Sequence, residues 1–175
     1  MRLKKRQSRP DSAASFEKNG VIESMNLAHI LNYRRISDRI ASSGQPEEHQ
    51  FKYIAAAGYR AVINLAMPNS DNAIPEEGNI VTALQLLYVH IPVPFDAPGR
   101  FHLRTFFGVM EAFRDHRVWL HCVVNHRVSG FLYLYRRLVE GVNAEEAKAV
   151  MLPTWKPDDV WQEFMRVSQD EILSP

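Results

Sequence analysis

The chain has 175 residues, 46% of them hydrophobic, and a formal net charge of +1. This length and apolar content suit a single domain with one core. The balanced charge argues against the strongly basic class of nucleic-acid-binding domains, so nucleic acid is not an expected partner. One cysteine excludes an intramolecular disulfide and a Cys-rich zinc motif, and the reducing cytoplasm is the expected compartment for a reactive thiol.

The first twenty residues are basic and polar, contain Pro10 and Gly20, and show no hydrophobic periodicity. We therefore expect a disordered basic tail over residues 1–20 and a single α/β domain over residues 21–175. The tail has no apolar stretch of the kind found in a signal peptide. The chain also has no run of roughly 18 or more apolar residues, so no membrane span is expected.

Hydrophobic spacing and turn residues predict strands and helices in alternation. Residues 34–41 predict one or two short edge strands, and later strands are expected at residues 60–66, 88–93 and 117–121. Helices are expected at residues 46–57, 75–86, 99–115 and 131–138. A capping box of Asn143 and Glu146 predicts another short helix, and Pro157 begins a last helix that runs to residue 172.

This alternation predicts an α/β sandwich with a largely parallel central sheet. In such sheets, ligands bind at the carboxyl ends of the strands. Cys122 falls at that edge, directly after the strand that ends in His121. The loops after Ala66 and Val93 should reach the same edge.

The stretch around Cys122 carries most of the functional information. An apolar run ends in His121 and Cys122, a polar loop with Arg127 and Ser129 follows, and a helix is expected from Phe131. A loop that opens a helix presents free N–H groups and binds oxyanions. The same setting, with cationic neighbours, can lower a cysteine pKa from about 8.5 to roughly 3.5–7.5. A buried structural cysteine is the alternative, but these flanking residues favour a nucleophile.

The segment from His121 to Ser129 resembles the signature of the cysteine-dependent protein tyrosine and dual-specificity phosphatases, in which His-Cys is followed by five residues and Arg-Ser or Arg-Thr. The turn Gly44-Gln45-Pro46 and the strand from Tyr59 to Leu65 are similar to bacterial phosphatase-like proteins related to the beta-lactamase-hydrolase-like group. Together these stretches span about residues 32–140. The resemblance implies a dual-specificity-phosphatase-like three-layer sandwich, with a mostly parallel central sheet flanked by helices.

The resemblance also implies hydrolysis of a phosphomonoester through a phosphocysteine at Cys122. Ser129 would hydrogen-bond the sulfur, and His121 would hold the loop and lower the thiol pKa. Asp96 would act as general acid and then as base, with Asp71 as the second choice; the alternative for Asp96 is an Asx turn between prolines. The expected phosphate-binding residues are Val123, Val124, Asn125, His126, Arg127 and Val128.

The expected partner is thus a phosphorylated substrate or an oxyanion such as phosphate or sulfate. The resemblance implies no metal or organic cofactor, and the histidines lack metal-site spacings. Among them, His90 and His102 are expected to be structural, and His126 to face solvent or substrate. Trp119, Phe131, Tyr133 and Tyr135 are expected in the core or on a half-buried face. Trp155 is expected to be a packing anchor, and the alternative is that it borders the pocket.

The position of the arginine differs from the phosphatase pattern. Arg127 lies five residues after the cysteine, whereas the pattern places the arginine at the sixth residue, here Val128. One residue at a helix start turns a side chain by about 100°. Asn125 replaces the usual glycine, and asparagine tolerates left-handed backbone angles. The spacing from Cys122 to Arg127 also fits a rhodanese-like sulfurtransferase. An active phosphatase, an inactive phosphate-binding relative and a sulfurtransferase all remain open.

Overall fold

The computed structural model describes residues 27–173. Its five-stranded sheet has the order β1-β2-β5-β3-β4, in which β1 runs antiparallel to β2 and the other pairs are parallel. The strands are β1 (Arg34–Arg35), β2 (Ile40–Ser43), β3 (Ala61–Asn64), β4 (Leu87–His90) and β5 (Val118–His121). The mostly parallel sheet predicted from the sequence is confirmed.

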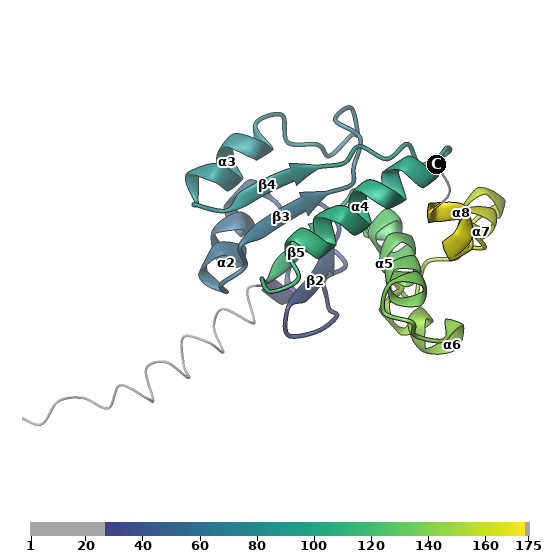
Figure 1. Cartoon of the computed structure of the whole chain (residues 1–175). Helices are drawn as coiled ribbons and strands as arrows, with labels where there is room; N and C mark the ends of the chain where they lie inside the picture. The colour runs from purple at the N-terminus through teal and green to yellow at the C-terminus, as the bar shows by residue number, and fades with distance from the viewer. Residues whose placement is uncertain (1–26, 174–175) are drawn as a thin grey trace, which may run out of the picture.

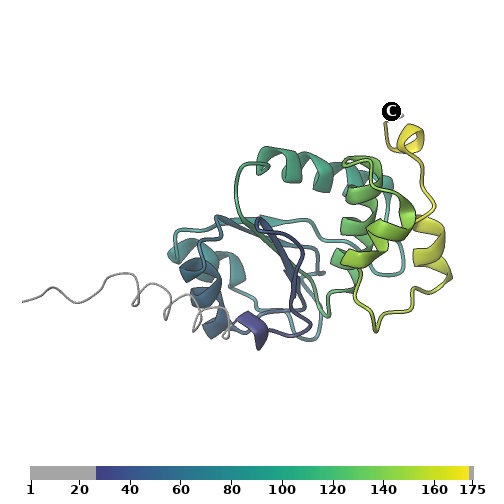
Figure 2. The same cartoon turned by 90° about the horizontal axis from the view of Figure 1, so that it is seen from below.

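Helices cover both faces of this sheet, which gives the expected three layers (Figure 1 and Figure 2). The α2 and α3 helices lie on one face, and α4 and α5 lie on the other. The helical segments are η1 (Glu48–Gln50), α2 (Phe51–Ala56), α3 (Glu77–Ala83), α4 (Arg100–Ala112), α5 (His126–Leu138), α6 (Ala144–Ala147), η2 (Lys148–Val150), α7 (Asp159–Phe164) and α8 (Gln169–Leu173).

Each face of the sheet has its own apolar core, because successive strand residues point to opposite faces. On one face, Trp119 of β5 packs in a cluster with Phe51 and Ile54 of α2. On the other face, Leu120 packs in a cluster with Phe106 of α4. His121 therefore follows the face of Trp119, while Cys122 belongs to the cluster on the α5 side. The side chains of His121 and Cys122 therefore lie on opposite faces of the sheet.

Of the C-terminal helices, α6 and α7 pack on α5, and α8 contacts α4 (Figure 1). Trp161 of α7 contacts the Phe131 ring with centroids 6.2 Å apart. Gly130 makes this close approach possible, since a Cβ atom there would lie 2.7 Å from the Trp161 ring. Phe131, Tyr133 and Tyr135 are buried, as the sequence predicted.

Three element predictions are corrected. The α5 helix begins at His126 rather than at Phe131, because Asn125 turns the chain in a left-handed conformation and accepts the first helical hydrogen bond from Ser129. β2 is not an edge strand, since it lies between β1 and β5 and is wholly buried. The helix predicted at residues 157–172 is two helices, because Ser168 and Glu171 exchange hydrogen bonds that start α8. The predicted tail lies outside the described residues.

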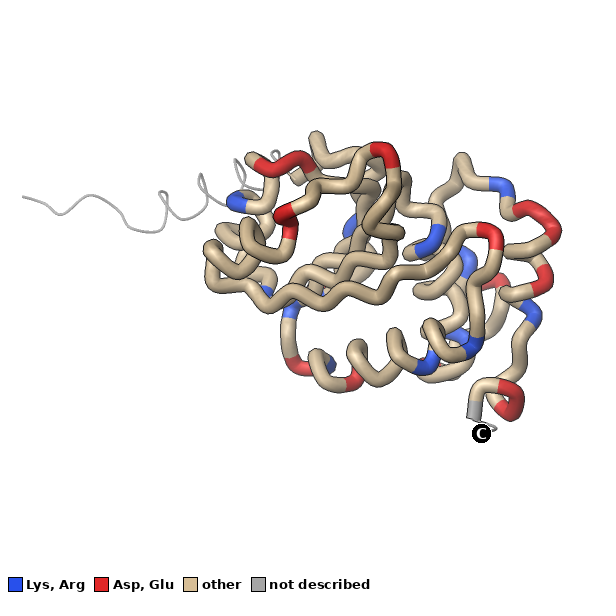
Figure 3. Tube along the Cα trace, turned by 90° about the horizontal axis from the view of Figure 1, so that it is seen from above, with Lys and Arg blue, Asp and Glu red and all other residues tan. Residues whose placement is uncertain are grey.

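Acidic and basic residues are interspersed over the described chain, in keeping with its balanced charge (Figure 3). Within residues 27–173, no helix combines the length and the apolar character needed to cross a membrane.

Candidate active site

The cysteine loop, residues 122–125, connects β5 to α5 at the carboxyl edge of the sheet. Cys122 is fully buried at its start, and Asn125 has a φ of +72° at its end. Within residues 27–173, the backbone N–H groups of residues 123–128 donate to no protein acceptor, and the first helical bond of α5 comes from Ser129. Successive free amides at a helix start form a concave anion site.

The side chain of Asn125 holds the end of the cysteine loop through hydrogen bonds to Asn32 and Ser42. Its Nδ2 donates to the carbonyl oxygen of Asn32 at 2.8 Å and to Oγ of Ser42 at 3.1 Å. In return, Nδ2 of Asn32 donates to the carbonyl oxygen of Val124 at 3.0 Å. Asn125 thus adopts the left-handed conformation that the sequence allowed and adds side-chain bonds that a glycine could not make.

The carbonyl oxygen of Val123 is held from the outer side of the loop. It accepts hydrogen bonds from the backbone N–H of Gln45 at 3.0 Å and from Nδ2 of Asn72 at 3.2 Å. Gly44 lets the chain approach, because a Cβ atom there would lie 2.9 Å from the same oxygen. The carbonyl groups are therefore occupied by protein donors while the amides stay available to an anion.

Arg127 lies in the first turn of α5 and its side chain turns toward the loop after β4. Its Nε–H donates to the carbonyl oxygen of Val93 at 2.8 Å, and its guanidinium carbon lies 5.2 Å from the centroid of the Phe95 ring. The side chain of Val128, the next residue, is fully buried in the core. Only the backbone N–H of Val128 is thus available to an anion.

The two candidate acids lie on loops that touch the cysteine loop or the start of α5. Asp96 is exposed on the turn closed by the hydrogen bond from Ala97 N–H to the Pro94 carbonyl, next to Phe95. Asp71 is exposed next to Asn72. Among residues 27–173, neither carboxylate accepts a hydrogen bond, so the Asx turn considered for Asp96 is not formed. Both carboxylates are open to solvent.

His126 is half-buried rather than freely exposed. Its ring stacks on Trp155, with centroids 5.1 Å apart and an interplanar angle of 11°. Burial, together with the charge of Arg127, lowers the pKa of His126 below the ordinary value for histidine. Trp155 is buried, as expected of a packing anchor, and it also borders the first residue of α5. At neutral pH this side of the site therefore carries a neutral imidazole.

Ser129 is fully buried one turn into α5. Its Oγ accepts a hydrogen bond from the backbone N–H of Leu152 at 3.0 Å. In the described part of the chain it makes no hydrogen bond to Cys122. The hydroxyl proton of Ser129 is free to be donated elsewhere, and its bond to the sulfur stays a prediction.

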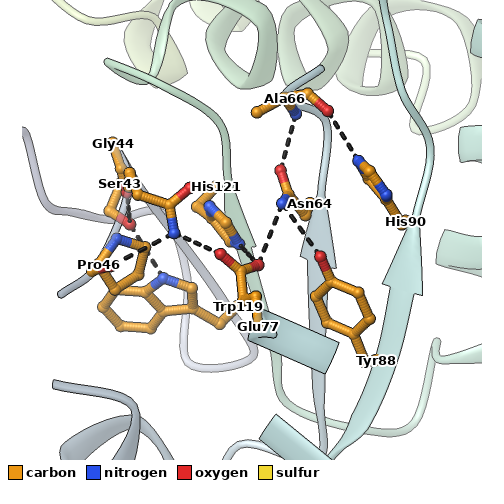
Figure 4. Close-up of polar contacts among 11 residues, drawn as sticks. Ser43, Gly44, Pro46, Asn64, Ala66, Glu77, Tyr88, His90, Trp119 and His121 are labelled. Carbon is orange, nitrogen blue, oxygen red and sulfur yellow. Dashed lines mark hydrogen bonds and ion pairs between the residues drawn. The ribbon is translucent and has the colours of Figure 1, made fainter. Parts of the chain in front are cut away.

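His121 belongs to a buried polar network that the sequence did not predict (Figure 4). Its Nε2 lies 2.9 Å from Oε1 of Glu77, the first residue of α3. Burial raises the pKa of Glu77, but the charge of His121 and hydrogen bonds from His121 and Gln45 outweigh it and hold that pKa below the usual range. Asn64 also donates to Oε1 of Glu77, at 3.0 Å. Glu77 is thus an ionised carboxylate beneath the cysteine loop.

His90 and His102 have structural contacts, as expected. A ring nitrogen of His90 lies 2.7 Å from the carbonyl oxygen of Ala66, and Nδ1 of His102 accepts the backbone N–H of Gly99 at 3.1 Å. Trp119 is buried in the core. Among the described residues, no three His, Cys, Asp or Glu side chains gather as metal ligands.

Comparison with solved structures relates this architecture to phosphatases. A protein from Shewanella putrefaciens described as "Putative phosphatase (DUF442)" is 33% identical, with a TM-score of 0.73 over 81% of this chain and 93% of that chain. TpbA from P. aeruginosa is 17% identical, with a TM-score of 0.65 over 81% and 88% of the two chains. The core catalytic domain of the PP-IP phosphatase SIW14 from S. cerevisiae is 13% identical, with the same coverage and TM-score. The last two similarities concern the fold alone.

Neither the comparison with family models nor the comparison with curated proteins gave a match.

Proposed function

The chain belongs to the superfamily of cysteine-dependent protein tyrosine and dual-specificity phosphatases, in the branch of the DUF442 protein from Shewanella putrefaciens, and we propose that it hydrolyses a phosphomonoester through a phosphocysteine at Cys122. The observation that carries the proposal is the run of free backbone N–H groups at residues 123–128, which starts directly after that cysteine. Such a site offers several donors to the equatorial oxygens of a phosphoryl group without needing a metal ion.

In the proposed reaction, the Cys122 thiolate attacks phosphorus while the bond between phosphorus and the ester oxygen breaks. Asp96 protonates that departing oxygen. The resulting Asp96 carboxylate then takes a proton from water, which attacks the phosphocysteine and releases inorganic phosphate and the thiolate. Ser129 supports this second departure through a hydrogen bond from its hydroxyl group to the departing thiolate.

Arg127 has two roles in the proposed reaction. Its guanidinium places a positive charge at the start of α5, where charge builds up on the transferred phosphoryl group. It also holds the loop that carries Asp96, through its contacts with Val93 and Phe95. We assign His126 and Val128 to phosphate binding through their backbone N–H groups.

The substrate class is a phosphotyrosine or phosphoserine type of ester or a small phosphorylated metabolite. TpbA, which shares the fold, has been solved in complex with pTyr, and this supports an aryl phosphate as the first substrate to test. We place the protein in the cytoplasm, because a catalytic thiolate needs a reducing compartment.

Activity assays with a phosphoryl donor and with a sulfur donor test the proposal. The protein should hydrolyse para-nitrophenyl phosphate and ignore thiosulfate, and Cys122→Ser should abolish turnover without changing the circular dichroism spectrum. Iodoacetate should alkylate Cys122 rapidly at pH 6.5, and phosphate or vanadate should slow the reaction. Transfer of one sulfur atom from thiosulfate to Cys122, seen in the intact mass, would instead identify a sulfurtransferase. Phosphate binding with neither activity would identify an inactive relative.

A further inference from the structure

Glu77, which has no role in the proposed reaction so far, is the centre of a polar network that includes His121, the residue before Cys122 (Figure 4). Only 3% of its surface is exposed. Its Oε1 lies 2.9 Å from Nε2 of His121 and 3.0 Å from Nδ2 of Asn64, and its Oε2 accepts a hydrogen bond from Nε2 of Gln45. The carboxylate thus joins the ends of β3 and β5 to the turn that follows β2.

Two of these partners lead directly to the cysteine loop. Gln45 donates its backbone N–H to the carbonyl oxygen of Val123, so one residue contacts both the carboxylate and the loop. His121 is bonded covalently to Cys122. A movement of the Glu77 carboxylate would therefore also displace Cys122 and Val123.

A buried carboxylate needs a reason, because taking its charge out of water is costly. A favourable interaction with the N-terminus of α3 does not explain the burial of Glu77. The adjacent Glu76 is exposed and already places a negative charge at that helix terminus. The groups around the carboxylate are instead Gln45, Asn64 and His121, which come from three separate segments. Asn64 Nδ2 also donates a hydrogen bond to the Tyr88 hydroxyl oxygen at 3.1 Å. This arrangement gives the carboxylate a role in holding those segments together.

We propose that Glu77 is a positioning residue for the thiol chemistry, which fixes Gln45 and His121 and thereby sets the shape of the anion site without touching the substrate. This inference rests on the proposed function of Cys122. It predicts that loss of the carboxylate weakens anion binding and lowers the rate at which the Cys122 thiol reacts, while the core packing is kept.

Glu77→Gln is the direct test, because it keeps the side-chain volume but replaces one acceptor oxygen with a donor that faces other donors. We expect kcat/KM for para-nitrophenyl phosphate to fall by about tenfold or more. The alkylation rate of Cys122 by iodoacetamide at pH 6.5 should also fall, and the phosphate concentration that protects the thiol should rise by about tenfold. The neighbouring exposed residue supplies the control, since Glu76→Gln should leave all three values unchanged.

Gln45→Met is the second variant, and it decides the question if Glu77→Gln does not fold. It removes the side-chain amide from Glu77 but keeps the backbone N–H that binds Val123. We expect the same weaker protection by phosphate. The double variant should be no worse than Glu77→Gln alone, because Gln45→Met removes a contact that Glu77→Gln already disrupts. Wild-type protection in a folded Glu77→Gln protein, or losses that simply add, would overturn the inference. Absence of anion protection in the wild-type protein would remove the proposed function as well.

Discussion

The Nε–H of Arg127 donates to the carbonyl oxygen of Val93 at 2.8 Å, so one side chain joins the first turn of α5 to the loop after β4. That loop carries Asp96, the candidate acid. The arginine comes one residue earlier than in the phosphatase signature, and this position directs it toward the loop rather than into the core. With the shorter spacing, the Arg127 guanidinium therefore lies beside the loop that carries Asp96.

Replacing Arg127 tests this view. Arg127→Ala should lower kcat/KM for para-nitrophenyl phosphate by about a hundred-fold or more, the usual cost of removing one donor from a transition-state anion site. Arg127→Lys should recover only a small part, because lysine lacks the planar group that bonds Val93 and lies against Phe95. Steady-state kinetics decide the matter. An alanine variant within a few-fold of wild type would remove Arg127 from the site.

Val128 gives the complementary test. Its side chain is fully buried, so Val128→Arg should place an unpaired charge in the core and destabilise the protein by about 3–5 kcal/mol, with no gain in activity. Val139, at the end of the same helix, is 48% exposed, and Val139→Arg should change stability by no more than about 0.5 kcal/mol. Urea unfolding measures both. A folded Val128→Arg protein with raised phosphatase activity would mean that position 128 faces the anion.

Two carboxylates compete for the role of acid. Asp96→Asn should lower kcat by about 10²–10⁴-fold, the range for general acid–base catalysis, whereas Asp71→Asn should have little effect. The loss should be larger with phenyl phosphate than with para-nitrophenyl phosphate, because a poorer leaving group depends more on protonation. The reverse ranking of the two variants would assign the acid to the loop after β3.

The pKa of His126 is lowered by burial and by the charge of Arg127, so the folded protein resists protonation of this ring. Stability from this group is fully present above the unfolded pKa of about 6.5 and is lost as pH falls through the lower folded pKa. The stability difference between wild type and His126→Gln should therefore shrink between pH 7.5 and pH 5. Urea unfolding at a series of pH values measures it, and a difference that grows on acidification would contradict the assignment.

The fold was predictable from the sequence because apolar spacing, Pro46 and Gly58 mark the alternation of strands and helices. Gly58 indeed ends the segment after α2, with a φ of +80°. The start of α5 was not predictable, since Val128, Ser129 and Gly130 are weak helix formers and only packing makes them helical. Local propensity gives no information about such tertiary contacts.

The candidate site was predictable only in part. The position of Cys122 after a strand placed the cysteine loop correctly at the carboxyl edge of the sheet. The role of Glu77 was hidden, because Glu76 and Glu77 look alike in a sequence and acidic residues are common at helix starts. Only the three-dimensional contacts show that one of the pair is buried beneath His121.

Gly130 and Trp161 link the packing of α7 to the candidate acid loop. A Cβ atom at Gly130 would lie 2.7 Å from Cζ3 of Trp161, and the Trp161 indole N–H donates to the carbonyl oxygen of Phe95 at 2.9 Å. A displaced indole would thus disturb the residue next to Asp96.

We therefore expect Gly130→Ala to destabilise the protein by about 1–3 kcal/mol, the cost of overpacking a core, and to lower kcat as well. Gly108, inside α4, is the matched control, since a Cβ atom there meets no other atom within 4 Å. Gly108→Ala should instead stabilise the protein by roughly 0.5–1 kcal/mol and leave kcat unchanged, because alanine is the better helix former. Thermal unfolding and steady-state kinetics of both variants test this. Equal stability changes in the two variants would show that Trp161 does not pack tightly on Gly130, and a wild-type kcat in Gly130→Ala would break the link to the acid loop.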